Sequence, residues 1–120
     1  MEMAEHQEER ASAVRERIDE YLAACFANES APRVTELARH LGLSRNRLDR
    51  IARDALGVPP SSYLKRRQLE EAQRLLATTT LSAQRIGYRT GFGTRRTFFR
   101  AFHAIIDLTP TQFRFRVRKA

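Results

Sequence analysis

The sequence has no tryptophan, a single cysteine and no long run of apolar residues. With Cys25 alone, no disulfide can form within the chain and no thiolate cluster can hold a metal. We interpret Cys25 as a small apolar residue buried on a helix, beside Leu22 and Phe26. No stretch approaches the roughly 18–20 apolar residues of a membrane span. Residues 1–10 are too acidic and polar for a signal peptide. We therefore expect a cytoplasmic protein with no membrane partner.

Acidic residues are scarce after position 30. Residues 1–30 contain eight acids and three arginines, a formal charge of −5, whereas residues 31–120 carry +13. Twenty of the 22 basic residues are arginines, and the guanidinium group suits bidentate contact with phosphate and guanine. A segment of this charge attracts polyanions, and its binding should depend strongly on salt.

The spacing of apolar residues predicts an all-α fold of about seven helices. We expect a flexible acidic leader over residues 1–9, followed by one domain over residues 10–120. Within that domain we predict a first helix-turn-helix unit over 10–58, a long linker helix over 61–77 and a second helix-turn-helix unit over 82–118.

The segment 86–113 carries the clearest functional pattern. Gly91 lies where a tight turn between two helices needs left-handed backbone. Phe98 and Phe102 share one face of the next helix, and we expect them to form core together with Ile105. The first two turns of that helix carry polar side chains, namely Arg95, Arg96, Thr97 and Arg100. A helix with an apolar face and a cationic N-terminal end is suited to the major groove of DNA.

An internal repeat relates the two halves of the chain. Leu48 matches Phe98 at an offset of fifty, and before the turn Ala38 matches Gly87 at an offset of forty-nine. The matches stay in register over the whole motif. The chain therefore contains two helix-turn-helix units joined by one long helix. Two recognition helices on one face of a duplex should lie about one turn, ~34 Å, apart. We thus expect a monomer to read two major-groove segments.

These residues resemble the AraC/XylS family of bacterial transcription activators over about Val34 to Arg116. The signature of the family's second unit is present as Ile86-Gly87, Gly91-Phe92, Phe98-Phe99-Arg100-Ala101-Phe102, Thr109-Pro110 and Phe113-Arg114. Its linker signature is present as Arg67, Leu69, Ala72, Leu75, Leu76 and Thr79. The resemblance implies a sequence-specific regulator of transcription at the bacterial nucleoid. It also implies an activator that recruits RNA polymerase, and not an enzyme.

Three positions depart from the family pattern. Gly87 replaces the usual Ala, which should weaken its helix by ~1 kcal/mol. Asp107 stands where Gly is usual, at the end of a helix, and Asp tolerates left-handed backbone better than most residues. Ala52 replaces a large apolar residue, which predicts a less firmly packed first unit.

The resemblance also implies which side chains contact bases. The candidates are Arg45, Asn46, Arg47, Asp49 and Arg50 in the first unit, and Arg95, Arg96, Thr97 and Arg100 in the second. Arg fits guanine, Asn fits adenine, Asp can accept from cytosine, and the Thr methyl can pack on thymine. Each Arg could instead contact phosphate or only solvent. Arg50 and Arg100 could form structural ion pairs, and Asp49 would weaken binding unless it is paired.

A second set of residues is expected at the DNA backbone. These phosphate-contact candidates are Arg39, Ser44, Ser62, Lys65, Arg66, Arg89, Thr94 and Thr111. Ser44, Ser62, Thr94 and Thr111 are first of all expected to be helix caps, and a capped helix N-terminus can also hold a phosphate. The three histidines have no ligand spacing, so we expect no metal and no cofactor.

Other functions are open at this point. A nonspecific or architectural DNA-binding protein would need only the positive charge. The chain could also be an excised DNA-binding domain of a larger, effector-responsive regulator, or a protein-docking module. The sequence shows no small-molecule pocket. No acid pair, nucleophile–base pair or phosphate loop favours an enzyme.

Overall fold

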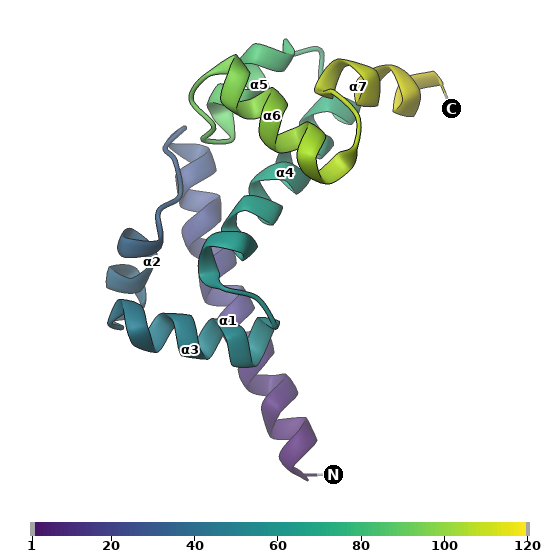
Figure 1. Ribbon diagram of the computed structural model, residues 1–120. Coiled ribbons are helices and arrows are strands. Elements are labelled where there is room, and N and C mark those ends of the chain that lie inside the picture. Colours follow the sequence, from purple (N-terminus) through teal and green to yellow (C-terminus); the bar gives the residue numbers. More distant parts are fainter. Residues whose placement is uncertain (1, 120) are drawn as a thin grey trace. The chain divides into compact units, whose positions relative to one another are not determined.

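The computed structural model describes residues 2–119, with side chains described from residue 5 onward. Every regular element in this range is an α-helix, so the predicted all-α class is confirmed (Figure 1). The helices are α1 (Glu2–Ala27), α2 (Val34–Leu41), α3 (Arg45–Leu56), α4 (Pro60–Thr78), α5 (Ala83–Arg89), α6 (Arg95–Ile106) and α7 (Pro110–Lys119).

The chain folds into two compact units, here called the N-terminal and C-terminal units. The N-terminal unit comprises the residues up to Cys25 together with Pro32–Lys65. The C-terminal unit comprises Phe26–Ala31 and the residues from Arg66 onward. The division falls inside α4, so the first turns of this helix serve one core and its remaining turns serve the other.

The core of the N-terminal unit combines apolar side chains from four helices. Those buried include Ile18, Tyr21, Leu22, Cys25, Leu37, Ala38, Leu48, Ala52, Tyr63 and Leu64. The Tyr21 hydroxyl accepts a hydrogen bond from the Arg33 backbone N–H (2.9 Å) and donates to the Arg33 carbonyl (3.3 Å). These bonds hold the start of α2, whose N-cap residue makes no side-chain capping bond. Burial of the phenol raises the pKa of Tyr21 to about 12.

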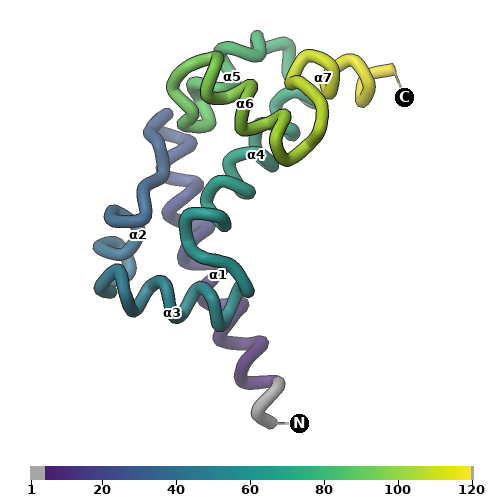
Figure 2. Tube along the Cα trace, in the orientation of Figure 1, coloured from purple at the N-terminus to yellow at the C-terminus, as the bar shows by residue number. Residues whose placement is uncertain are grey.

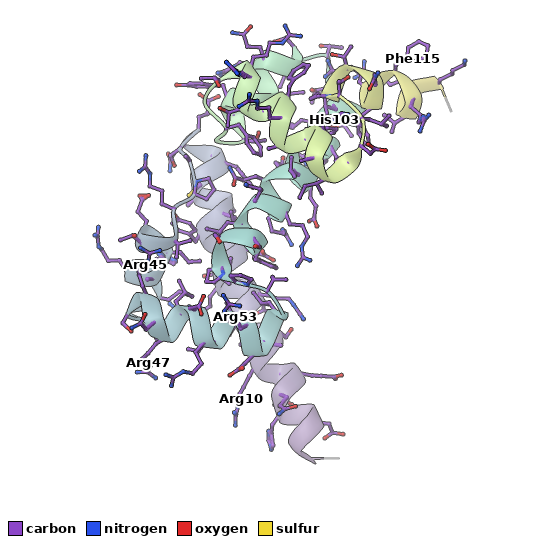
Figure 3. All side chains as sticks on the ribbon, viewed as in Figure 1. Arg10, Arg45, Arg47, Arg53, His103 and Phe115 are labelled. Atoms are coloured by element: carbon purple, nitrogen blue, oxygen red, sulfur yellow. The ribbon has the colours of Figure 1, made fainter. Side chains whose placement is uncertain are left out.

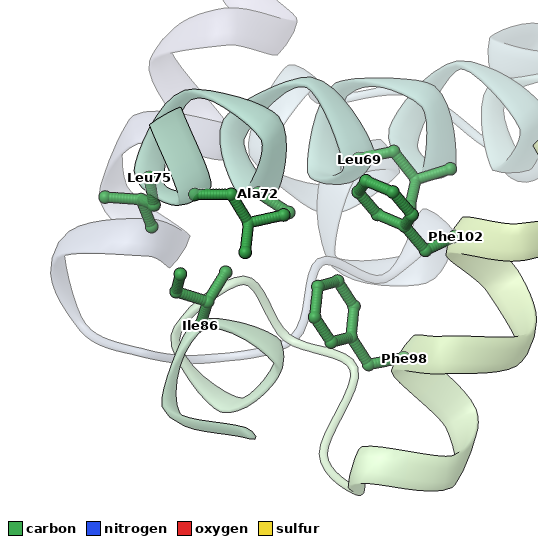
Figure 4. Close-up of a cluster of buried hydrophobic side chains, with 7 residues drawn as sticks. Leu69, Ala72, Leu75, Ile86, Phe98 and Phe102 are labelled. Carbon is green, nitrogen blue, oxygen red and sulfur yellow. The ribbon is translucent and has the colours of Figure 1, made fainter. Parts of the chain in front are cut away.

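The core of the C-terminal unit is built around two phenylalanines of α6. Phe98 and Phe102 are fully buried, with ring centroids 5.7 Å apart. They pack with Leu69, Ala72, Leu75, Leu76 and Ile86 of α4 and α5 (Figure 4). The expected third member of this stripe, Ile105, is 57% exposed, and Ile106 packs against the cluster instead. Ile106 lies four residues after Phe102, a spacing that keeps it on the same face of the helix.

Short turns join the consecutive helices α5, α6 and α7 (Figure 2). Gly91, between α5 and α6, has φ +89°, so the predicted left-handed turn is confirmed. Asp107, at the end of α6, has φ +64°, in agreement with its expected role in place of glycine. The prediction that Gly87 weakens α5 did not take account of Phe98, which packs against Gly87. A Cβ atom at Gly87 would lie 2.8 Å from Phe98 Cγ, so the ring needs the glycine.

Several predicted helix boundaries are wrong. Helix α1 begins at Glu2, where we expected a flexible leader over residues 1–9. Glutamate, glutamine and alanine in that segment favour helix, and acidic side chains stabilise a helix N-terminus. Helices α4 and α7 begin at Pro60 and Pro110, because proline suits the first helical position. The predicted caps Ser62 and Thr111 therefore lie inside the first turn.

Candidate nucleic-acid interface

The start of α3 presents polar side chains to solvent. Ser44 caps the helix, because its hydroxyl accepts a hydrogen bond from the Arg47 N–H at 3.2 Å. Arg45, Asn46 and Arg47 are exposed, and Arg45 and Arg47 project outward from the helix (Figure 3). The first turn contains no acid, so the positive end of the helix dipole adds to the arginine charge. This end of the helix is suited to anions.

The start of α6 is built in the same way. The Thr94 hydroxyl accepts from the Thr97 N–H at 3.1 Å and donates to the Thr97 hydroxyl at 2.9 Å. Arg95, Arg96 and Arg100 are exposed, and this first turn also lacks an acid. The predicted caps Ser44 and Thr94 are therefore confirmed. Both helices offer an exposed cationic N-terminal end.

Most equivalent positions of α3 and α6 are buried or exposed to the same extent. Leu48 and Ala52 anchor α3 as Phe98 and Phe102 anchor α6, and all four are fully buried. From the cap to the seventh position, the two helices have the same succession of exposed, buried and half-buried residues. The structure thus exposes the base-contact candidates of both units, apart from half-buried Asp49, while it buries the residues that hold them. The predicted helix-turn-helix repeat is present in three dimensions.

The acidic candidate Asp49 is paired. Its carboxylate accepts from Arg53 Nε at 2.8 Å, one turn along the helix. This pair is exposed, so it adds little to stability. The pair meets the condition under which an acid can lie on a phosphate-binding surface. Among residues 5–119, neither Arg50 nor Arg100 takes part in an ion pair, so the expected structural alternative for them has no support here.

The phosphate candidates divide into two groups. Arg39, Lys65 and Arg66 are exposed on α2 and α4. Arg89 is half-buried, and its Nε lies 3.7 Å from the Glu29 carboxylate, which also accepts from Arg85 at 2.6 Å. Glu29 therefore competes with phosphate for Arg89.

The C-terminal caps differ from the prediction. Thr109, and not Thr111, caps α7: its hydroxyl accepts from the Gln112 N–H at 3.1 Å, and the Gln112 side chain accepts from the Thr109 N–H at 2.9 Å. This reciprocal pair is a capping box. Thr111 and Ser62 remain exposed, so the structure leaves both available as phosphate contacts.

Sequence reasoning missed two arginine contacts. Arg114 donates to the Leu76 carbonyl at 3.1 Å and to the Thr79 carbonyl at 3.2 Å, and so satisfies the C-terminal end of α4. Burial and the neighbouring charge of Arg118 lower the pKa of Arg114. On α6, the Arg95 guanidinium lies over the Phe99 ring, with Cζ 4.4 Å from the centroid. The i,i+4 spacing of Arg95 and Phe99 could have indicated the second contact.

Membrane-spanning helices and metal sites are both missing from the described part of the chain. No helix there has the length and apolar character needed to cross a bilayer. No group of three or more His, Cys, Asp or Glu side chains there is arranged to hold a metal ion.

Known proteins match this chain over most of its length. The helix-turn-helix domain family matches residues 37–116. The transcriptional activator AarP of Providencia stuartii is 30% identical over 79 residues, which are 66% of this chain and 58% of AarP. The arabinose operon regulatory protein of Escherichia coli is 30% identical over 81 residues, which are 68% of this chain and 28% of that protein. The chain thus spans little more than half of one relative and just over a quarter of the other.

Solved structures agree with these matches. An AraC-type transcriptional regulator from Chromobacterium violaceum superposes with a TM-score of 0.73 and 27% identity, covering 88% of this chain and 96% of that one. The DNA-binding domain of AdpA, solved in complex with a target DNA, gives a TM-score of 0.75 and 26% identity over 84% of this chain and 92% of that one. The exposed, arginine-rich starts of α3 and α6 thus lie within a known fold, and the chain belongs to the AraC/XylS family of helix-turn-helix transcription regulators.

Proposed function

We propose that this chain binds double-stranded DNA in a sequence-specific manner and regulates transcription, with α3 and α6 as its recognition helices. The observation that carries the proposal is the matched pattern of exposure at the starts of these helices. Each sets arginines on a capped, acid-free N-terminal end that is anchored by two buried apolar side chains. Guanidinium groups at such a helix start are suited to base edges in a major groove, and this supports the proposal.

The proposed contacts fall into two classes. The base-reading residues are Arg45, Asn46, Arg47, Asp49, Arg50, Arg95, Arg96, Thr97 and Arg100. The phosphate-binding residues are Arg39, Ser44, Ser62, Lys65, Arg66, Arg89, Thr94 and Thr111, which would position the protein without reading sequence. Asp49 would read cytosine only if its bond to Arg53 opens or is shared. Arg89 would act only after exchanging Glu29 for a phosphate.

The wider role rests on the family. We propose that the chain binds at the nucleoid as a monomer, activates transcription and contacts RNA polymerase. AarP is named as a transcriptional activator, which supports this direction of regulation. A chain with two recognition helices should select two half-sites about one helical turn apart.

The main alternative is nonspecific DNA binding. The charge of +13 on residues 31–120 would hold many duplexes without any base contact. Sequence-specific and nonspecific binding differ in how an arginine on α6 affects the affinity for different DNA sequences. A base-reading arginine discriminates among sequences, whereas a phosphate-binding arginine strengthens binding to every sequence by the same factor.

The decisive experiment is a bind-and-sequence selection on random duplex DNA at near-physiological salt. We expect a bipartite motif whose halves lie about ten base pairs apart. Affinities of the wild type and of R96A are then measured for the selected site and for versions with single base changes. R96A should lose roughly 5- to 150-fold discrimination at one base step, equivalent to about 1–3 kcal/mol.

A matched control separates readout from charge. R17A removes one exposed arginine from α1, outside the recognition helices. It should leave discrimination at every base step unchanged. The proposal is refuted if no motif is enriched, or if R96A lowers affinity by the same factor on all sequences.

A further inference from the structure

Arg95 is the arginine at the start of α6 that stacks on an aromatic ring. Its Cζ lies 4.4 Å from the centroid of Phe99, four residues later on the same helix. At this spacing the two side chains lie one above the other on the helix surface. The distance is well inside the ~6 Å range of a cation–π contact.

The Phe99 ring, over which Arg95 lies, is held in place by core residues. Phe99 is half-buried and packs against the core cluster of the C-terminal unit. Its ring meets Phe98 edge-on, with centroids 5.9 Å apart and an interplanar angle of 85°. Phe98 is itself fully buried. Phe99 therefore links a fixed core residue to an exposed guanidinium.

From this geometry we propose that Phe99 is a positioning residue that orients Arg95 for base reading, so that Phe99 sets sequence preference through Arg95. This inference rests on the proposed function. A guanidinium that lies over a ring can keep the N–H groups on its edge free to donate. Bidentate contact with guanine requires those edges in a defined direction. A side chain ordered before binding loses less conformational entropy when it binds.

Helix α3 has no aromatic ring at the matching position. Arg45 and Asp49 occupy the positions in α3 that correspond to Arg95 and Phe99 in α6. Asp49 bonds to Arg53, on the side away from Arg45 along the helix. The two recognition helices thus differ in how their first arginine is supported. We expect the sharper base preference at the half-site read by α6.

The test compares F99L, F99Y and R95A on the selected DNA site and on its single-base variants. Leucine keeps an apolar side chain against the core but has no aromatic face, whereas tyrosine keeps the face. F99L should reduce discrimination at the base step read by Arg95 about two- to fivefold, the range of an exposed cation–π contact. F99Y should keep the discrimination of the wild type at this base step. Thermal unfolding of each variant separates this effect from any change in stability.

The double variant R95A/F99L makes the inference falsifiable. If Phe99 acts through Arg95, the double variant discriminates no worse than R95A. The inference is overturned if R95A loses discrimination while F99L keeps it, or if F99L and F99Y lose it equally. If R95A itself keeps full discrimination, Arg95 is not a base reader, and that part of the proposed function fails separately.

Discussion

Replacing Gly87 by alanine should destabilise the protein, although helix propensity alone predicts the opposite. Gly87 lies inside α5, where alanine would favour the helix by about 0.5–1 kcal/mol. An added Cβ would, however, lie 2.8 Å from Cγ and Cδ2 of Phe98 and 2.9 Å from its Cβ. The last of these atoms is attached to the backbone of α6, so a simple ring rotation cannot relieve the contact.

The size of the effect follows from two opposing contributions. Overpacking a well-filled core costs about 1–3 kcal/mol. Subtracting the gain in helix propensity of about 0.5–1 kcal/mol leaves a net loss of about 0–2.5 kcal/mol for G87A. The corresponding positions of the N-terminal unit carry Ala38 and Leu48, both buried. Compared with the pair Ala38–Leu48, the pair Gly87–Phe98 has a smaller residue on the first helix and a larger residue on the second.

Urea unfolding followed by circular dichroism at 222 nm measures this prediction. The variants are G87A, F98L, the double variant G87A/F98L and, as a control in the other unit, A38G. The double variant recreates the Ala–Leu pair of the N-terminal unit, so it should recover about 1–2 kcal/mol relative to the sum of the single changes. A38G should cost about 1 kcal/mol. The reasoning is refuted if G87A stabilises the protein, or if the two single effects simply add.

Three other changes test the remaining structural assignments. T109A should cost about 1 kcal/mol of unfolding free energy through loss of the cap of α7, whereas T111A should change it by less than about 0.5 kcal/mol; equal effects would contradict the capping box. R114A should cost about 1.5–3 kcal/mol, because two carbonyls at the end of α4 lose a charged donor. R116A, on the exposed side of the same helix, serves as its control, and a similar loss in both would disprove the specific role. The pKa of Tyr21 is raised to about 12, so its neutral form contributes stability in full below about pH 10, and this contribution declines as pH rises toward 12. In Y21F, denaturant unfolding between pH 9 and 12 should therefore show a lower but flatter stability than the wild type, and an unchanged slope would contradict this assignment.

The local features of this protein could be predicted from its sequence. The caps Ser44 and Thr94, the left-handed turn at Gly91 and the aspartate at the end of α6 all follow from backbone preferences over a few residues. The repeat at an offset of fifty then predicted which helix starts would be exposed. These features are readable because each depends on neighbours along the chain.

Contacts between residues far apart in the chain, and the choice between two neighbouring side chains for the core, could not be predicted in this way. The sequence predicts that Gly87 weakens α5, whereas in the structure the Phe98 ring lies against Gly87 and leaves no room for a larger residue. Arg114 belonged to a family signature, but its two acceptors lie 38 and 35 residues earlier in the chain. The choice of Ile106 over Ile105 for the core depends on the rotation of α6 against its neighbours. A packed interior joins residues by shape and by unmet hydrogen bonds, and neither is encoded in their spacing along the sequence.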